Sequence, residues 1–137
     1  MEVCADFLFA IETAMRAGEI RGLDRSRIRG KVAHLPKTKN GTARDVALSP
    51  AALSIIDQMP PELWQGITAA SLDALWRKIR NRAGIDDLHF HDSRHEAVTR
   101  LSKKLNVLEL ARMTGHKDIR ELMTYYEDDA EEVAGKL

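Results

Sequence analysis

Cysteine is almost absent from this 137-residue sequence, since Cys4 is its single thiol. One cysteine excludes an internal disulfide framework and a cysteine-rich zinc site. No apolar run is long enough to span a bilayer, and the first fifteen residues contain no Lys or Arg, unlike the basic start of a signal peptide. We therefore expect a cytoplasmic protein with no membrane contact.

Net charge is also lacking, because 21 Lys and Arg balance 21 Asp and Glu. The charges are nevertheless segregated along the chain. Residues 16–44 hold nine Lys and Arg against two acidic residues, and residues 76–104 hold eight against four. Two basic blocks between acidic ones suggest a face for a polyanion, although solvated surface faces would give the same pattern. Charge alone favours the second interpretation, since the sequence lacks the high pI of a strong DNA binder.

The hydrophobic pattern predicts a mostly helical chain. Residues 28–48 are the exception, because alternating apolar residues flank Asn40-Gly41, which is typical of a tight hairpin turn. Ser49 and Pro50 are the expected cap and first residue of the next helix. The expected helices cover 3–16, 50–59, 68–83, 91–104, 107–113, 118–126 and 127–135, with Gly18 and Gly22 ending the first pattern. The predicted fold class is mostly α with a small antiparallel β-sheet (α+β).

The strongest local motif is His91-Asp92-Ser93-Arg94-His95. Residues three apart share a helix face, so His91 and Arg94 can converge on one ligand. Arginine matches phosphate oxygens with a planar fork of donors, and histidine can donate to an oxyanion or move a proton near neutral pH. An isolated pair of this kind is weak evidence and is compatible with an exposed structural pair.

Further motifs follow in a defined order: "TAMRAGEI", "KTKNGTARDVALS", "FHDSRH", "MTGHKD" and "LMTYYEDDAEEVAGKL". In this order and at roughly this spacing, the sequence resembles the tyrosine recombinase family, phage integrases in particular. The resemblance runs through nearly the whole chain and implies the catalytic-domain fold of that family. Five motifs together make coincidence improbable, although each alone is modest.

The resemblance implies a role for each matched residue. Arg16 and Arg94 would hold the non-bridging oxygens of the scissile phosphate, and His91 and His116 would hydrogen-bond the same group. Lys39 would protonate the departing 5′ oxygen. Tyr125 would attack phosphorus and form a 3′-phosphotyrosyl link. Glu19 matches an acidic position that orients the site.

These residue types suit the chemistry. A phosphodiester transition state gathers negative charge on its oxygens, so fixed cationic donors stabilise it more than the ground state. The covalent link to tyrosine stores the bond energy, so that rejoining needs no ATP. We expect no cofactor and no metal, because the histidines lack metalloenzyme spacing.

Several assignments have alternatives. Lys37 competes with Lys39 in the mobile hairpin tip, and Tyr126 competes with Tyr125, because motif spacing fixes the register only to within a residue or so. Arg16 could instead be a cation at the end of a helix, paired with Glu19 at the surface. Structural roles are expected for three other histidines, His34, His89 and His95, and Trp64 and Trp76 are expected to anchor the core or an interface.

The expected organisation is a single catalytic domain over residues 1–137, with the family's N-terminal core-DNA-binding domain absent from this chain. The expected partner is double-stranded DNA, bound by a homo-oligomer (a tetramer on DNA, a monomer alone). A type IB topoisomerase-like enzyme and a non-catalytic DNA-binding module that retains the fold remain as alternatives.

Overall fold

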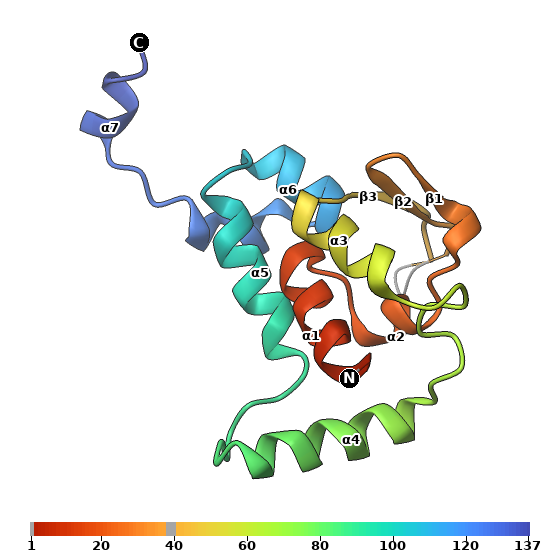
Figure 1. Cartoon of the computed structure of the whole chain (residues 1–137). Coiled ribbons are helices and arrows are strands. Elements are labelled where there is room, and N and C mark those ends of the chain that lie inside the picture. The colour runs from red at the N-terminus through yellow and green to blue at the C-terminus, as the bar shows by residue number, and fades with distance from the viewer. Residues whose placement is uncertain (1, 38–40) are drawn as a thin grey trace.

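The computed structural model describes residues 2–37 and 41–137 and is arranged around a helix near the N-terminus (Figure 1). This helix, α1 (Glu2–Thr13), packs against α3 (Pro50–Gln58), α4 (Ala69–Arg82) and α5 (Asp92–Ser102). Phe9 and Ala10 of α1 are fully buried. The helix predicted over residues 3–16 is thus the centre of the core.

α1 ends three residues before the predicted boundary. The Thr13 hydroxyl donates to the carbonyl of Phe9 at 2.8 Å and accepts from the N–H of Met15 at 3.2 Å. Ala14 then adopts a left-handed φ of 59°, which stops the helix. A short helix, α2 (Ala17–Arg21), follows at once and carries Glu19 in its first turn. The sequence did not predict this helix, because Gly18 and Gly22 interrupt the helical pattern there.

The sheet confirms the predicted hairpin strands. After a 3₁₀ turn (η1, Arg25–Arg27), β1 (Ile28–Arg29), β2 (Val32–Leu35) and β3 (Arg44–Ala47) form an antiparallel sheet in the order β1-β2-β3. Leu35 pairs with Arg44 at the last described register position. The tip with Lys39 lies outside the described residues.

The remaining helices begin at polar caps. Ser49 accepts from the N–H of Ala52 at 3.1 Å in front of α3, as the sequence predicted. Thr68 caps α4 in the same way, and Asn106 caps α6 (Val107–Thr114). The predicted 118–126 helix is instead a 3₁₀ helix, η2 (Ile119–Tyr125). The observed fold is mostly helical with one small antiparallel sheet, so the predicted class is confirmed.

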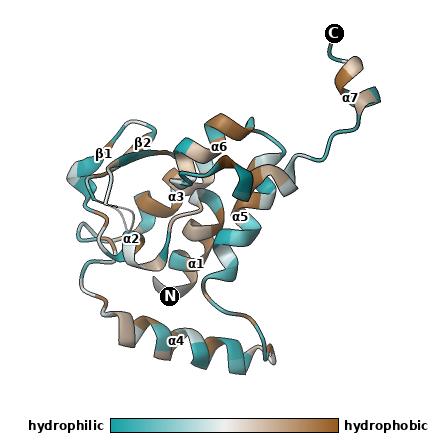
Figure 2. Cartoon of the chain, turned by 180° about the vertical axis from the view of Figure 1, so that it is seen from behind, coloured by the Kyte–Doolittle hydropathy of each residue, from teal (hydrophilic) through white to brown (hydrophobic). Residues whose placement is uncertain are grey.

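Two tryptophans anchor the core, as expected. Trp64 is fully buried beside Phe9, and Trp76 stacks on Phe7 with ring centroids 4.6 Å apart. Hydrophobic residues on α1 and α3 lie toward the middle of the molecule when it is seen from behind (Figure 2). The packing of these hydrophobic residues holds α4 and α5 against α1. It therefore sets the positions of the motif residues at the start of α5.

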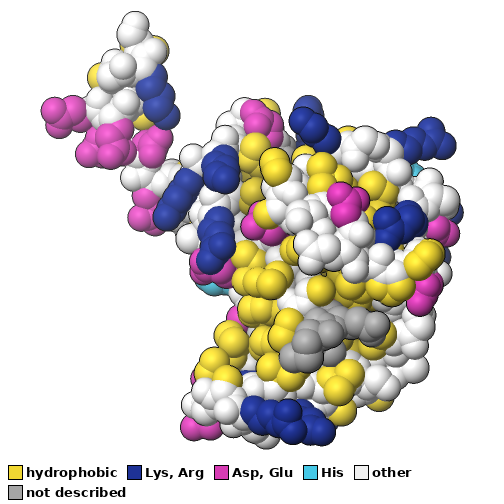
Figure 3. Space-filling view, viewed as in Figure 1, with side chains coloured by type: hydrophobic (Ala, Val, Ile, Leu, Met, Phe, Trp, Pro, Cys, Tyr) yellow, Lys and Arg dark blue, Asp and Glu magenta, His cyan; other side chains and the backbone are white. Residues whose placement is uncertain are grey.

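The C-terminal segment leaves the body. It ends in α7 (Ala130–Ala134), which projects away from the other helices (Figure 1) and carries a group of acidic side chains (Figure 3). All residues from Glu127 to Leu137 are exposed. Of the helices that the structure describes, none combines the length and apolar character needed to cross a membrane.

Candidate active site

Arg94 is a buried cation that joins two distant elements. It lies in the first turn of α5, and its guanidinium donates to the carbonyls of Ala14, after α1, and of Thr114, at the end of α6. The Nη2–O distance to Thr114 is 2.9 Å. Burial, with the nearby charges of Arg16 and Arg44, lowers the pKa of Arg94 to about 10. It therefore stays charged at neutral pH as a pre-positioned anion ligand.

His116 lies beside Arg94 because α6 ends sharply. Gly115 takes the left-handed conformation (φ 80°), and the chain turns back toward α5. His116 Nδ1 is 2.6 Å from Thr114 Oγ1. Burial first, then the Arg94 charge, lowers the pKa of His116 below its usual value, against an opposite effect from Glu121.

The two adjacent tyrosines face different surroundings. The Tyr125 hydroxyl lies 3.0 Å from His95 Nδ1, at the edge of the pocket. The Tyr126 hydroxyl donates to the carbonyl of Leu105 at 2.8 Å. Burial raises the pKa of Tyr126, with a smaller contribution from Glu109. Tyr126 is therefore engaged in packing, whereas Tyr125 faces the site.

A single pocket of about 300 Å³ collects most of the matched residues. His91, Arg94, His116 and Tyr125 all line it, although they come from the start of α5, the turn after α6 and the end of η2. Its other lining residues are Asp92, His95, Val98, Glu121 and Leu122. The pocket thus combines an arginine, several imidazoles and a phenol, which is a set that can bind an oxyanion beside a nucleophile.

Arg16 does not line this pocket but lies close behind it. Its charge lowers the pKa of both Arg94 and His116. Its Nη1 is 3.8 Å from Glu19 Oε1 and makes no hydrogen bond to any described residue. The guanidinium is therefore incompletely satisfied by the described part of the chain, which leaves it capacity to bind an anion.

Arg44 is a site residue that the sequence reasoning missed. Its side chain is 8% exposed and forms a two-pronged pair with Glu19, with Nη2 3.0 Å from Oε1. Its Nε donates to the carbonyl of Met113 at 3.0 Å. It therefore ties α2 to the end of α6. The signal was available, because strand alternation places Arg44 on the inward face with Val46.

Glu19 lies between these two arginines and pairs with both. Burial alone would raise the pKa of Glu19, but hydrogen bonds from Arg44 and from the N–H of Arg16, together with both charges, lower it below its usual range. The Arg16 N–H lies 2.9 Å from Glu19 Oε1. The carboxylate is thus ionised and orients the two arginines.

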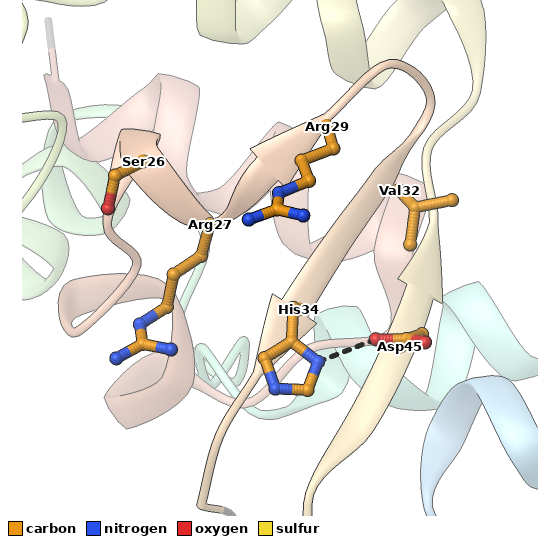
Figure 4. A pocket seen from close by; sticks show the side chains of 6 residues that line it. All are labelled: Ser26, Arg27, Arg29, Val32, His34 and Asp45. Atoms are coloured by element: carbon orange, nitrogen blue, oxygen red, sulfur yellow. Dashed lines mark hydrogen bonds and ion pairs between the residues drawn. The ribbon is translucent and has the colours of Figure 1, made fainter.

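The remaining predicted positions lie elsewhere or outside the description. Lys39 lies outside the described residues, but β3, which follows the tip, packs against α6. His34 and Asp45 pair across strands at 2.7 Å in a separate hollow on the outer face of the sheet, which Arg27 and Arg29 also line (Figure 4). That hollow contains none of the matched residues. The His95 ring is exposed and contacts Tyr125, and its structural role stays a prediction.

Two proteins of known sequence are similar to nearly the whole of this chain. The chain is 46% identical over 97% of its length to a putative integrase/recombinase of Haemophilus influenzae, and 43% identical over 96% to a shufflon-specific DNA recombinase of Escherichia coli. It spans 46% and 36% of the lengths of those two proteins. The site described above therefore corresponds to less than half of the length of either relative.

Solved structures share the fold at low sequence identity. A lambda integrase dimer bound to a COC′ core site matches with a TM-score of 0.73 and 14% identity, over 94% of this chain and 53% of that one. The XerH site-specific recombinase bound to difH substrate, in a pre-cleavage complex, matches with a TM-score of 0.69 and 19% identity, over 98% and 45%. The model of the phage integrase family matches residues 64–132, half of this chain. The chain therefore belongs to the phage integrase family, the tyrosine recombinases.

Proposed function

We propose that this chain is the catalytic domain of a site-specific DNA recombinase, which cleaves and rejoins strands through a 3′-phosphotyrosyl intermediate on Tyr125. The observation that carries the proposal is the shared pocket of Arg94, His91, His116 and Tyr125, with Arg16 close behind it. The start of α5, the turn after α6 and the end of η2 meet there, and each supplies a group suited to a phosphodiester.

The proposed roles follow from the surroundings of each side chain. Arg94, which lines the pocket, and Arg16, whose charge is felt by Arg94 and His116, bind the non-bridging oxygens. His91 and His116 hydrogen-bond the same phosphate as charge builds up on it. Lys39 protonates the departing 5′ oxygen, and Glu19 orients Arg16. Removing one such pre-positioned donor costs about 10²–10³ in rate in comparable sites.

The partner in this proposal is double-stranded DNA, bound by a homo-oligomer that is a tetramer on DNA. Structures of related fold hold DNA, including the lambda integrase dimer on its core site. Exposed Arg77, Lys78 and Arg82 on α4 would contribute to a basic DNA-facing surface (Figure 3). A cytoplasmic location belongs to the same proposal. The relatives named above are integrases and recombinases, so they give no support to a topoisomerase or a non-catalytic module.

The test uses nicked duplexes, from which cleavage releases a short oligonucleotide and traps the covalent complex. A pool with a randomised core supplies the unknown site, and SDS-resistant protein–DNA complexes are recovered and sequenced. The wild-type chain should form adducts, Tyr126→Phe should retain them, and Tyr125→Phe should abolish them. Adducts that persist in Tyr125→Phe, or none from the wild type across the pool, would contradict the proposal.

A further inference from the structure

The hydroxyl of Tyr125 has a defined partner on another element. His95 Nδ1, on α5, lies 3.0 Å from it, and the ring centroids are 5.8 Å apart. Within the described part of the chain, this is the hydrogen bond that the hydroxyl makes. The contact joins η2 to α5 at the rim of the pocket that Arg94, His91 and His116 also line.

The position of His95 follows from helix geometry. Successive helical residues point about 100° apart, so α5 turns Arg94 inward and His95 along the rim. Arg94 is 6% exposed and bonds the carbonyls of Ala14 and Thr114, whereas the His95 ring is open to the pocket. One helix therefore presents a phosphate ligand and an imidazole side by side.

A phenol needs a base to act as a nucleophile at neutral pH. An ordinary tyrosine has a pKa near 10, so only about one molecule in a thousand is ionised at pH 7. Imidazole is the side chain best matched to taking a proton near neutrality, provided that it lies within hydrogen-bond distance. His95 meets that geometric condition in the free protein.

The other titratable groups around the pocket have different contacts. His116 Nδ1 faces Thr114, and its Nε2 is 3.7 Å from Glu121. Asp92 accepts from the N–H of His89 at 2.8 Å. The charged and titratable groups that line the two pockets with His95 are Asp92, Arg94 and Glu96 on α5, His91 before it, His116 after α6, and Glu121 and Tyr125 on η2.

We propose that His95 is the general base for Tyr125, an inference that rests on the proposed function. The Nδ1 lone pair takes the phenol proton as the Tyr125 Oη–P bond forms and the P–O5′ bond breaks. The departing 5′ oxygen takes its proton from a separate acid, Lys39 in the proposed scheme. On rejoining, Lys39 takes the proton of the 5′ hydroxyl as the 5′ oxygen attacks phosphorus, the Oη–P bond breaks, and protonated His95 returns its proton to the Tyr125 oxygen.

The decisive variant is His95→Gln, which keeps a polar side chain but cannot take up a proton. Single-turnover cleavage of a selected nicked duplex should slow about 10²–10⁴-fold, the range for general base catalysis. His34→Gln is the matched control, because His34 lies on the sheet in a different hollow, and its rate should equal that of the wild type. A rate for His95→Gln within threefold of the wild type, with adducts forming normally, overturns the inference and leaves the proposed function intact.

Two further readouts separate base catalysis from a structural role. His95→Ala should regain rate with added imidazole, in proportion to its neutral form, whereas Tyr125→Phe should not. The wild-type cleavage rate should fall as the pH is lowered, because a protonated imidazole cannot act as a base, and His95→Gln should lose that acidic limb. Absence of rescue together with an unchanged pH profile in His95→Gln overturns the inference.

The contact itself can be tested without DNA. Imidazole ¹⁵N spectra should show neutral His95 accepting at Nδ1 and protonated at Nε2, and Tyr125→Phe should shift these resonances. Unchanged His95 resonances in Tyr125→Phe overturn the contact. Absence of adducts from the wild type instead overturns the proposed function, so the two failures are distinguishable.

Discussion

At the scale of single residues, the site is held by a carboxylate among arginines. Glu19 and Arg44 are each 8% exposed at the side chain, so neither charge is satisfied by water. Breaking a buried pair leaves an uncompensated charge, which costs more than the pair contributes. The pair therefore matters both for stability and for placing Arg16.

Arg44→Gln should lower the free energy of unfolding by about 3–5 kcal/mol, the usual cost of removing one partner of a buried pair. Urea denaturation measures the change. Arg100→Gln is the control, since Arg100 forms an exposed pair with Glu96, and it should shift stability by less than about 1 kcal/mol. Equal effects of the two substitutions would show that the Arg44 contacts contribute little.

Asp6 gives a prediction about pH. It is fully buried, neither carboxylate oxygen has a hydrogen-bond partner among the described residues, and burial raises its pKa from 3.8 to about 7, opposed by Arg21. Between these values the folded state binds more protons than the unfolded state, so Asp6 makes stability fall as pH rises from about 4 to 7. Above about pH 7 the carboxylate is ionised in both states, so the loss of stability that it causes no longer changes with pH.

Asp6→Asn removes this titration while keeping the shape of the side chain. The free energy of unfolding of the variant, minus that of the wild type, should be larger at pH 8 than at pH 4 by on the order of a few kcal/mol. Urea denaturation at both pH values measures the difference. If this difference in free energy of unfolding is the same at pH 4 and pH 8, the pKa of Asp6 is not raised by folding.

Sequence spacing could predict which residues lie together where one helix sets the geometry, and the structure places His91 and Arg94 in one pocket. His91 and Arg94 were found because residues three apart share a helix face. The contacts of Arg44 and His95 could not be predicted, because their tertiary partners, Glu19 and Tyr125, are 25 and 30 positions away in sequence. The resemblance favoured Tyr125 over Tyr126, but no local pattern could show that the Tyr126 hydroxyl bonds the carbonyl of Leu105.

At the scale of elements, the turns that end helices position the site. α1 ends early at Ala14, whose carbonyl then accepts from Arg94, and α6 ends at Gly115, which places His116. Periodicity predicts where a helix is favoured but not where a tertiary hydrogen bond stops it. The sequence therefore located the helices while missing α2 and the 3₁₀ form of η2.

Gly115→Ala tests the second of these turns. Its φ of 80° disfavours any side chain, and a Cβ would lie 3.2 Å from Cδ and Nη1 of Arg44. The strain alone should cost about 1–2 kcal/mol, measured by thermal or urea unfolding. Gly66→Ala is the control, because Gly66 has no positive φ and no atom within 4 Å of its Cβ position; comparable losses in both variants would contradict the account.

At the scale of the whole molecule, the catalytic body and the C-terminal segment are separate in their packing. Residues Glu127–Leu137 are all exposed, and α7 stands apart from the core (Figure 1). Ending the chain after Tyr126 should therefore change the unfolding free energy by less than about 0.5 kcal/mol. A larger loss of stability in the isolated protein would show that the segment supports the body.

The distribution of charge in the folded molecule differs from what the zero net charge suggests. The sequence segregates basic and acidic blocks, and the fold brings residues from both basic blocks, Arg16 and Arg94, to the same site. A composition average could not show this, because the local field depends on the placement of each charge.

The central claim is that Tyr125 becomes covalently joined to a DNA 3′ phosphate. The direct measurement is peptide mass spectrometry of the trapped adduct, after nuclease and protease digestion. We predict a nucleotide remnant on the peptide that contains both tyrosines, with fragment ions that assign it to Tyr125. A remnant on Tyr126, or on any other side chain, would contradict the account.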